Sequence, residues 1–532
     1  MERHDAIIIG GGLNGLTAAA YLARFGARVL VLERNAALGG ADASYEIVPG
    51  FNIARYNLGI STLPARIVSE LDLARYGLRF IRVDGGISLL KDGGYIASYR
   101  DGVIHRRELA RHSLKDADGW TRFRRDMLRG AQQLRPLLAT TMSDPTRRSF
   151  STLRRLLSTA SRWGARDVDE LHELTRLWTL SCAEFLDAYF HSDAVKTRLA
   201  GDALAGTSLG PHAPTGARHL IGAFIDEMAT ASGGAPARVL ASGGPAAVAG
   251  ALRAAIEAHG GTIRTDAEVT DVLLREGAAR GVVLANGEEI QARAVVSDLD
   301  LKRTFLALFP WSALPGGLVE KVGRFRMRGV SAKINIALDS APEFPAVPAG
   351  CPALLGGVRL ASSLDEMDRA ADDWRDGIPP RVPLIDMLIP TLADPTLAPH
   401  GRHVLSVAVH YVPESLHDGA WTGERRDELT DLVVDRIAEA SPGIKDRIVA
   451  LEMLTPPDIE SEVGVTGGDL SHGETTLDQS FFNRPSPALA GYETPIRNLY
   501  LCSQSVHPGP LGVGNAGANA AALVAAALGK RG

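Results

Sequence analysis

Residues 5–34, which read DAIIIGGGLNGLTAAAYLARFGARVLVLER, constrain the fold of this chain more than any other segment. The apolar run over residues 6–9 predicts a buried strand, and residues 16–25 have the spacing of a helix that packs on a sheet. Residues 28–32 predict a second strand, and Glu33 stands at its carboxyl end. This order predicts a βαβ unit that binds a dinucleotide. The alternative is a glycine-rich turn in an unrelated α/β protein.

The glycines between the first strand and the helix have separate roles. Gly10 allows the tight turn, Gly12 lets the backbone approach a diphosphate, and Gly15 lets the helix pack closely on the strand. Leu13 and Asn14 open the helix, whose free N–H groups and positive dipole end favour phosphate. All five residues are candidate cofactor-binding residues.

The acidic residue and the glycine pair that follows it discriminate between dinucleotides. The Glu33 carboxylate accepts hydrogen bonds from ribose hydroxyls and disfavours a 2′-phosphate, so NADP is not expected. Arg34 is a candidate beside it. Gly39 and Gly40 resemble the extended FAD motif of the glutathione-reductase-like superfamily, in which the pair lets the chain pass close to the flavin diphosphate. The arginine that often follows this pair is replaced here by residues 41–42, Ala-Asp.

A second glycine-rich segment lies near the carboxyl end of the sequence. Residues 498–502 predict a strand, residues 503–517 a loop, and an alanine-rich helix follows to about residue 528. No crossover, second strand or carboxylate follows the glycines, so this is not a second nucleotide fingerprint. The helix N-terminus would stabilise negative charge on a reduced flavin. The candidate cofactor-binding residues here are Ser503, Gly512, Val513 and Gly514.

Two side chains are candidates for a catalytic role. His507 lies in the loop expected to approach the flavin, although a lone loop histidine is more often a structural hydrogen bonder. Residues 332–338 alternate as a strand, with Lys333 on one face. Flavin amine oxidases have a lysine on a comparable strand, bridged by water to the flavin, and Lys333 resembles it loosely. A surface or salt-bridged lysine is the alternative.

Nearly the whole chain resembles the phytoene desaturase-type flavoproteins, and most closely the bacterial relatives of pyridine nucleotide-disulfide oxidoreductase domain-containing protein 2. The segments that carry the resemblance are residues 49–73 with 76–78, residues 394–399, residues 477–479 with 484–485, and residues 499–509. The resemblance implies FAD as cofactor and a backbone contact from around Val269 to its adenine end. The family loop after His-Pro-Gly usually has more glycines than the Pro-Leu at residues 510–511.

The fold class that follows is α/β, with a Rossmann-like FAD-binding domain of glutathione-reductase type and an inserted α+β substrate domain that combines a mixed sheet with helices. The FAD-binding domain is predicted to be discontinuous, over residues 1–80, 237–305 and 490–532. The substrate domain is predicted over residues 81–236 and 306–489, with a largely helical part at 105–230.

Two local patterns support this division. Apolar residues recur at helical spacing and predict a core-facing helix: Trp120, Phe123, Met127, Leu134 and Leu138. In the returning part of the nucleotide domain, residues 246–259 predict a helix and Asn286-Gly287 predicts a hairpin between strands at 279–284 and 289–297.

Composition excludes several classes of protein. A net charge of −5 and a pI near 6.3 give no reason to expect nucleic acid as a partner. The three cysteines, Cys182, Cys351 and Cys502, form no C-x-x-C pair, so neither a disulfide reductase nor a metal site is predicted. The sparse cysteines fit a cytoplasmic location, and no run reaches the roughly 18 apolar residues of a membrane span.

Residues 147–166 combine arginines with interleaved leucines and contain no acidic residue. A basic amphipathic helix of this kind suits peripheral contact with an anionic membrane. A solvated helix face or a contact between copies of the chain is the favoured alternative, since charge runs usually have that role. The oligomeric state stays open, with a homodimer as one alternative.

The leading functional hypothesis is transfer of a hydride from a C–H or C–N bond of an apolar small molecule to FAD. The sequence contains neither a second fingerprint for a nicotinamide nor a redox-active pair of thiols. Electrons would therefore pass from the reduced flavin to oxygen, a quinone or another protein. The alternatives are a flavin amine oxidase, a redox-neutral isomerase that uses reduced FAD, and a flavin-binding partner protein without catalysis.

Overall fold

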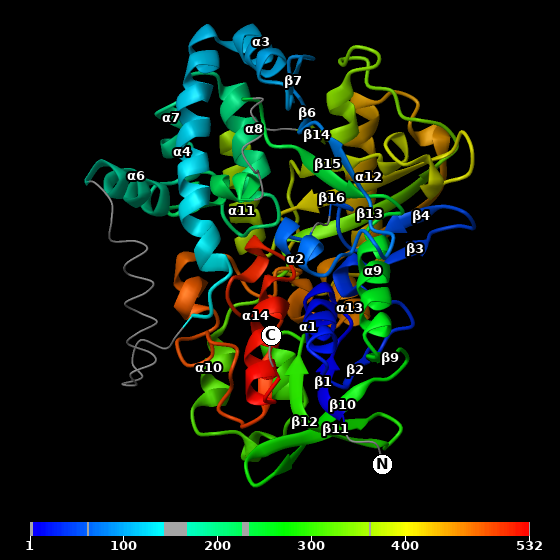
Figure 1. Cartoon of the computed structure of the whole chain (residues 1–532). Helices are drawn as coiled ribbons and strands as arrows, with labels where there is room; N and C mark the ends of the chain where they lie inside the picture. The colour runs from blue at the N-terminus through cyan, green and yellow to red at the C-terminus, as the bar shows by residue number, and fades with distance from the viewer. Residues whose placement is uncertain (1–3, 61–62, 143–167, 226–232, 361–362, 531–532) are drawn as a thin grey trace.

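The computed structural model describes residues 4–60, 63–142, 168–225, 233–360 and 363–530. The basic segment at 147–166 lies outside them, so the prediction of membrane contact there stays a prediction. Two sheets and a helical region organise the described chain (Figure 1). The first sheet lies at the bottom of that view, the second at the upper right, and the helices at the upper left.

The first sheet contains the predicted nucleotide-binding strands. Its order is β10–β11–β12–β1–β2–β9, with β18 paired to β12, and β1 pairs in parallel with both β12 and β2. Its strands are β1 (His4–Ile9), β2 (Val29–Leu32), β9 (Thr262–Arg264), β10 (Val269–Arg275), β11 (Ala278–Leu284), β12 (Glu289–Ser297) and β18 (Leu499–Leu501). Asn286-Gly287 turns the chain between β11 and β12, which pair antiparallel, so the hairpin prediction is confirmed.

Three helices pack against this sheet: α1 (Leu13–Arg24), α9 (Ala246–Ala258) and α14 (Asn515–Ala527). Helix α1 is buried over every residue except Arg24, and it contacts both α9 and α14. Small alanines on α1 and α14 let the two helices approach closely. Helix α14 begins at Asn515, so the loop before it is shorter than the predicted 503–517.

The second sheet is mixed, in the order β17–β13–β16–β15–β14–β6–β7. Its strands are β6 (Gly86–Leu89), β7 (Tyr95–Ser98), β13 (Ser331–Leu338), β14 (Val358–Leu360), β15 (Leu384–Leu388), β16 (His403–His410) and β17 (Ile448–Leu454). Alternate residues of β13 and β16 enter an apolar core that also contains Leu429, Val433 and Ile437 of α12 (Gly423–Ala440). The opposite face of the same strands presents polar residues, among them Lys333 and Asn335.

The helical region contains α3 (Gly102–His112), α4 (Leu114–Leu138), α6 (Val168–Thr179), α7 (Cys182–Asp187) and α8 (Asp193–Leu204), and a 3-10 segment, Gly216–Phe224, packs among them. The Ser113 side chain accepts a hydrogen bond from the N–H of Asp116 and caps α4. The five apolar residues predicted to form a core face all lie on α4 and are buried, so that prediction is confirmed.

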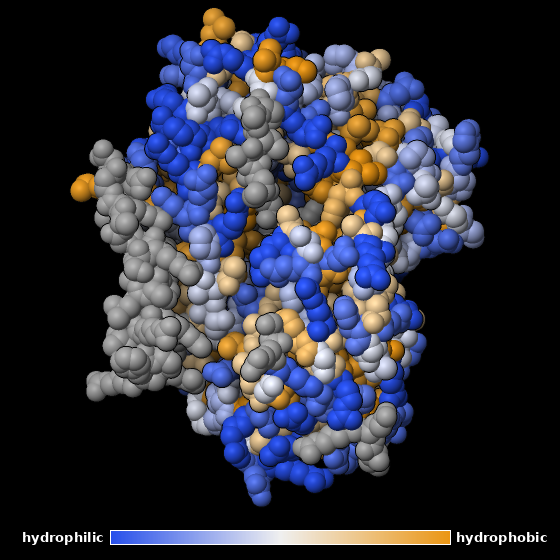
Figure 2. All heavy atoms as spheres, in the orientation of Figure 1, coloured by the Kyte–Doolittle hydropathy of each residue, from blue (hydrophilic) through white to orange (hydrophobic). Residues whose placement is uncertain are grey.

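Shorter elements connect these layers. They are β3 (Ser44–Glu46), β4 (Asn52–Ala54), α2 (Ala65–Glu70), β5 (Phe80–Val83), β8 (Arg238–Ala241), α10 (Leu318–Arg324), α11 (Leu364–Arg375) and α13 (Pro456–Val463). Hydrophilic residues cover most of the face in Figure 2, with hydrophobic residues scattered between them. Among the described residues, no helix combines the length and hydropathy that crossing a bilayer requires.

Candidate dinucleotide site and adjoining cavity

The glycine turn between β1 and α1 has the close packing that its sequence predicts. Gly10 adopts a φ of +100°, a left-handed conformation that favours glycine. A Cβ on Gly15 would lie 2.5 Å from the Gly10 carbonyl oxygen, and a Cβ on Gly12 would lie 2.5 Å from Asp298 Oδ2. Gly12 is the N-cap of α1 and provides no capping side chain. The Asp298 carboxyl instead interacts with the backbone N–H groups of Gly12 and Gly15 at this helix end.

Glu33 lies at the carboxyl end of β2 and is bound from two sides by the backbone. Its Oε2 accepts the N–H of Gly11 at 2.7 Å, and its Oε1 accepts the N–H of Asn35 at 2.8 Å. These bonds fix the carboxylate beside the glycine turn, where its remaining acceptor positions can meet ribose hydroxyls.

The glycine pair runs alongside this turn. The N–H of Gly39 donates to the Gly11 carbonyl at 2.8 Å, and Gly12 and Gly39 form an isolated parallel bridge. A Cβ on Gly40 would stand 3.4 Å from Gly12 Cα. The two glycine segments therefore form one cradle whose width depends on missing side chains, which suits the extended diphosphate of a flavin dinucleotide.

The carboxyl-terminal segment closes onto the same place. The N–H of Gly514, the N-cap of α14, donates to Asn14 Oδ1 at 2.8 Å. Ser503 is buried just after β18, and Gly512 and Val513 are half-buried directly before the helix. The structure thus brings the start of α14 against the start of α1, although the two are separated by about 500 residues.

Two other predicted cofactor residues lie near Glu33 with different environments. Val269 is buried at the start of β10, two positions after Ala267, whose N–H donates to the Glu33 carbonyl at 2.9 Å. The Arg34 guanidinium instead donates to the carbonyls of Ser461 and Glu462 at the end of α13. The structure therefore assigns Arg34 a helix-capping contact, and its role toward a cofactor stays a prediction.

Asp298 touches the fingerprint directly and was not predicted from the sequence. It follows β12, its N–H donates to the Ile9 carbonyl at 2.8 Å, and its side chain lies against Gly10, Gly12 and Gly15. Burial raises the pKa of this carboxyl well above its usual range, and nearby Glu33 adds to the effect. The sequence gives no local signal for this contact, because Asp298 reaches the glycines through the pairing of β12 with β1.

His507 is buried and lines a cavity. Its Nε2 lies 2.9 Å from the Leu137 carbonyl, and its ring stacks on Phe481 with centroids 6.1 Å apart. Burial lowers its pKa to about 4, so the imidazole is neutral at physiological pH. The structural hydrogen bond was the alternative expected from the sequence, and the position on the cavity wall keeps a ligand contact open.

Lys333 is buried on the polar face of β13, with 1% of its surface exposed, so the surface alternative is wrong. Its Nζ donates to Asn335 Oδ1 and to the Ile334 carbonyl. Burial lowers its pKa to about 7, although Glu452 acts in the opposite direction. Lys333 does not line the cavity that contains His507, so the structure does not unite the two catalytic candidates.

The cavity beside the carboxyl-terminal segment has a volume of about 310 Å³, near the lower end of the roughly 300–1,000 Å³ usual for small-molecule sites. Its apolar wall includes Leu138, Trp178, Phe481 and Leu511, and the Trp178 and Phe481 rings lie 5.1 Å apart. Leu511 stands three positions before Gly514, so the cavity adjoins the segment that meets α1.

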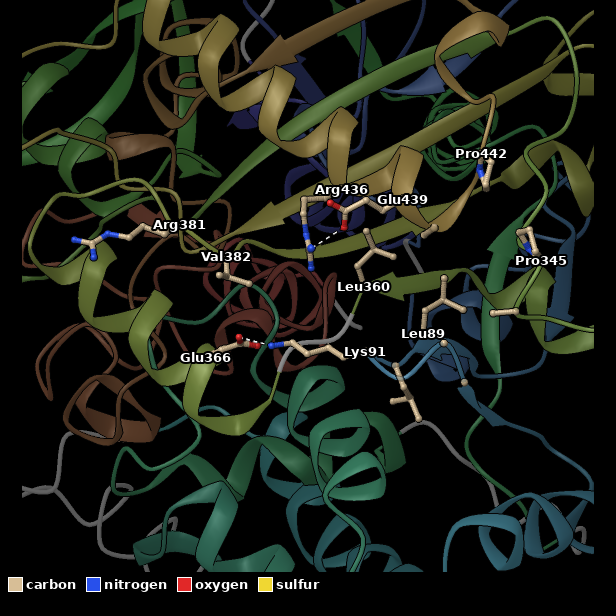
Figure 3. A pocket seen from close by; sticks show the side chains of 15 residues that line it. Leu89, Lys91, Pro345, Leu360, Glu366, Arg381, Val382, Arg436, Glu439 and Pro442 are labelled. Carbon is tan, nitrogen blue, oxygen red and sulfur yellow. Dashed lines mark hydrogen bonds and ion pairs between the residues drawn. The ribbon is translucent and has the colours of Figure 1, made fainter.

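A larger cleft of about 740 Å³ lies at the edge of the second sheet (Figure 3). Four of its charged side chains form two ion pairs, Lys91 with Glu366 and Arg436 with Glu439. It contains none of the predicted site residues. Among the described residues, His, Cys, Asp and Glu side chains form no cluster suited to a metal ion.

Comparison with known proteins agrees with this geometry. Residues 8–70 match the family model of the NAD(P)-binding Rossmann-like domain. The chain is 33% identical to pyridine nucleotide-disulfide oxidoreductase domain-containing protein 2 of Rattus norvegicus over 98% of this chain and 93% of that one. The chain belongs to this family.

This member of the pyridine nucleotide-disulfide oxidoreductase domain-containing protein 2 family is also similar to more distant proteins. The chain is 24% identical to prolycopene isomerase 1 of an Oncidium hybrid cultivar over 99% of this chain and 85% of that one. A solved oxidoreductase from Methanosarcina mazei has the same fold, with a TM-score of 0.58, 18% identity and coverage of 99% and 100%. These comparisons place the chain in an oxidoreductase-domain family and show a Rossmann-like nucleotide-binding domain within it.

Proposed function

We propose that this protein is an FAD-dependent oxidoreductase that takes a hydride from a C–H bond of an apolar organic substrate, where a C–C or C–N single bond becomes a double bond as a proton leaves the neighbouring atom. The observation that carries the proposal is the contact between Gly514 and Asn14, which joins the carboxyl-terminal helix to the fingerprint helix. A second segment beside the fingerprint suits the extended length of a flavin dinucleotide, and here the start of α14 would be that segment.

The residues of the cradle fit this cofactor. Glu33 would bind the ribose, the α1 N-terminus with Gly12 and Gly39–Gly40 would hold the diphosphate, and the α14 N-terminus would favour negative charge on the reduced ring. When bound, FAD supplies the hydride acceptor. The apolar cavity walls would orient the substrate and exclude water from it.

An amine oxidase is the main alternative, because an aromatic pair lines the cavity. The charges around the cavity argue against a protonated amine as substrate. Among the described residues, the one carboxylate in the lining is Asp202, which is already paired with Arg198, Arg238 and Arg359. The lining also contains two cations, Arg218 and Arg484, and like charge on the wall repels an ammonium group.

The first experiment is purification of the full chain and release of its cofactor by denaturation, with identification by mass. Anaerobic bleaching of the flavin band is then measured across alkenes, alcohols, carboxylic acids and amines. Bleaching by an apolar compound with a product two hydrogens lighter supports the proposal. Colourless protein that cannot be reconstituted with FAD refutes it, and an isomer of unchanged mass indicates the redox-neutral alternative.

A further inference from the structure

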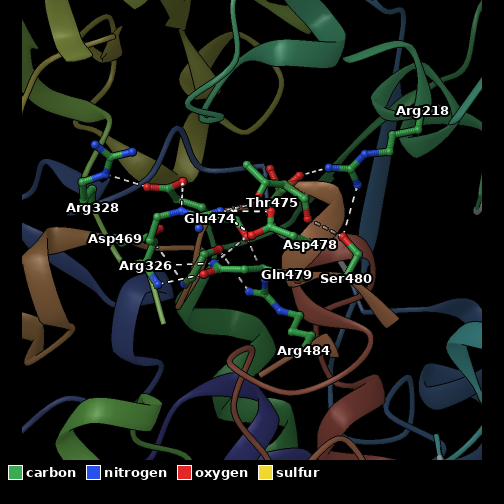
Figure 4. A network of polar contacts seen from close by, with 12 residues as sticks. Arg218, Arg326, Arg328, Asp469, Glu474, Thr475, Asp478, Gln479, Ser480 and Arg484 are labelled. Atoms are coloured by element: carbon green, nitrogen blue, oxygen red, sulfur yellow. Dashed lines mark hydrogen bonds and ion pairs between the residues drawn. The ribbon is translucent and has the colours of Figure 1, made fainter. Parts of the chain in front are cut away.

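Two arginines beside the cavity, Arg218 and Arg484, form no ion pair with a carboxylate of the loop over residues 471–484 or of the other described residues. Glu474 forms ion pairs with Arg326 at 3.1 Å and with Arg328 at 2.6 Å, and Asp478 pairs with Arg326 at 2.9 Å. These partners lie on the far side of the loop from Arg218 in Figure 4. The acidic residues of the loop are therefore already compensated.

The two buried arginines of the cavity differ in how their N–H groups are used. Arg484 donates to several backbone carbonyls, including those of Gln504, Glu474 and Ser471. Its guanidinium therefore has a structural role, because it holds the surrounding loops together. Arg218 donates to the Thr475 carbonyl and to Ser480 Oγ at 3.4 Å, and within the described chain it forms no ion pair with a carboxylate. Arg218 is the cation that a ligand can still neutralise.

Three polar side-chain atoms of the cavity lining have no hydrogen-bond partner within the part of the chain that the structure describes. They are Arg218 Nε, His219 Nε2 and Thr475 Oγ1, and all three are buried. Buried polar atoms are nearly always paired in native proteins, so each unpaired one needs an explanation. Their presence in one cavity, together with the apolar Trp178 and Leu138, indicates a polar group of a ligand at that position.

We propose that these residues, the polar wall of the cavity, bind the carboxylate of a substrate whose remaining part is apolar. Arg218 Nε–H and the Thr475 hydroxyl would donate to the carboxylate oxygens, and the aromatic pair of Trp178 and Phe481 would cover the chain. A guanidinium is the side chain best suited to a carboxylate, because it donates through a rigid planar fork.

The charge of Arg218 is retained in this environment. Burial lowers the pKa of its guanidinium only to about 10, and Asp478 acts in the opposite direction. The side chain is therefore positively charged at neutral pH, so a bound carboxylate would neutralise it.

This assignment rests on the proposed function, since it takes the cavity beside the carboxyl-terminal segment as the substrate site. It is tested by calorimetric titration of the FAD-loaded full chain with decanoate, decanol and decylamine, which share a chain length and differ in the head group. We expect decanoate to bind at least about tenfold more tightly than the other two, as charge-assisted hydrogen bonds require.

Variants assign the preference to the polar wall. Arg218→Gln is expected to remove most of the preference for decanoate, and Thr475→Val, which deletes the hydroxyl, to reduce it several-fold. Arg381→Gln is the matched control, because Arg381 is an exposed arginine that lines the other cleft. If Arg218→Gln does not fold, Thr475→Val and the wild-type ligand ratio decide the question.

Equal affinity for decanoate and decanol, or an unchanged preference in Arg218→Gln and in Thr475→Val, overturns the inference. The cofactor measurement is separate from this titration. Protein that binds FAD but does not discriminate the three head groups contradicts the carboxylate site alone, whereas protein that cannot be loaded with FAD contradicts the proposed function.

Discussion

Asn14 and Gly514 are joined by a hydrogen bond of 2.8 Å, from the backbone N–H of Gly514 to the side-chain oxygen of Asn14. Both residues are buried, and each stands at the N-terminus of a helix that packs on the first sheet. One side chain thereby sets the distance between the two positive helix ends that would face the cofactor.

Asn14→Ala is expected to lower stability by about 1 kcal/mol and to weaken FAD binding several-fold, because α14 loses its anchor on α1. Thermal unfolding and FAD titration of the apoprotein measure the two effects. Asn519→Ala is the control: Asn519 is also buried on α14, but it bonds to Leu138 O and Tyr492 Oη. Its loss should cost stability without changing FAD affinity, and equal loss of FAD affinity in both variants would argue against the specific role of Asn14.

Glu33→Gln is expected to weaken FAD binding by about tenfold to a hundredfold. The carboxylate accepts two backbone N–H groups, whereas the amide presents one oxygen and places a donor against the other N–H. Equilibrium titration of the apoprotein with FAD measures the change. Glu257→Gln on the exposed face of α9 should retain wild-type affinity, and wild-type affinity in Glu33→Gln would remove Glu33 from the site.

Lys333→Met is expected to change how stability depends on pH. The pKa of Lys333 is lowered to about 7 by burial, whereas that of an unfolded lysine is about 10.4. Between these values the unfolded chain binds a proton that the folded chain does not, so Lys333 makes the free energy of unfolding rise with pH by up to about 1.4 kcal/mol per unit.

Denaturant unfolding at pH values from 7 to 9 measures this slope, and Lys333→Met should lack the contribution. Lys445→Met, at an exposed lysine that pairs with Asp435, should keep the wild-type slope. Parallel slopes for wild type and Lys333→Met would show that the lysine is charged in the folded protein. A loss of turnover in Lys333→Met with substrate affinity unchanged would support its predicted catalytic role.

Asp386→Asn is expected to destabilise the second sheet by about 3–5 kcal/mol, because it removes the two-oxygen partner of the buried Arg359 guanidinium and leaves it only Asp202, which Arg198 and Arg238 share. Arg359 Nε lies 2.7 Å from Asp386 Oδ1, and His410 Nε2 lies 3.0 Å from Oδ2. Burial alone would raise the pKa of Asp386, but Arg359 and His410 hold it well below its usual range. The stability it contributes is therefore present above pH about 4 and lost as the pH falls below that value.

Denaturant unfolding at neutral pH compares Asp386→Asn with Glu320→Gln. Glu320 pairs with Arg324 on α10, where both side chains are mostly exposed, so its substitution should cost less than about 1 kcal/mol. A similar small cost for both variants would mean that the buried pair contributes no more than a surface one.

Local patterns in the sequence were sufficient for the parts of the fold that depend on neighbours along the chain. The core face of α4 follows from the helical spacing of its apolar residues. The glycine turn before α1 and the hairpin at Asn286-Gly287 follow from the backbone conformations that a few residues must adopt. The approach of Gly39 to Gly12 also lies within one βαβ unit and its extension.

The polar wall of the cavity and the contact of Asp298 were not predictable in this way. Arg218 and Thr475 are 257 positions apart, and nothing in either local sequence indicates that they line one cavity. Asp298 reaches the fingerprint only because β12 pairs with β1, a long-range register that one sequence does not reveal. The unequal pairing of the arginines near the cavity likewise depends on which carboxylates the folded loop presents.

The contribution of β18 and α14 to the first sheet has a consequence for biosynthesis. Strand β18 pairs with β12, and α14 packs on α1, so the cradle that starts at the glycine turn is completed by residues that are synthesised about 500 positions later. A nascent polypeptide that has emerged only as far as residue 498 has its glycine turn but lacks the opposite end of the cradle. Stable flavin incorporation is therefore expected only after β18 and α14 have been synthesised and have folded onto the first sheet.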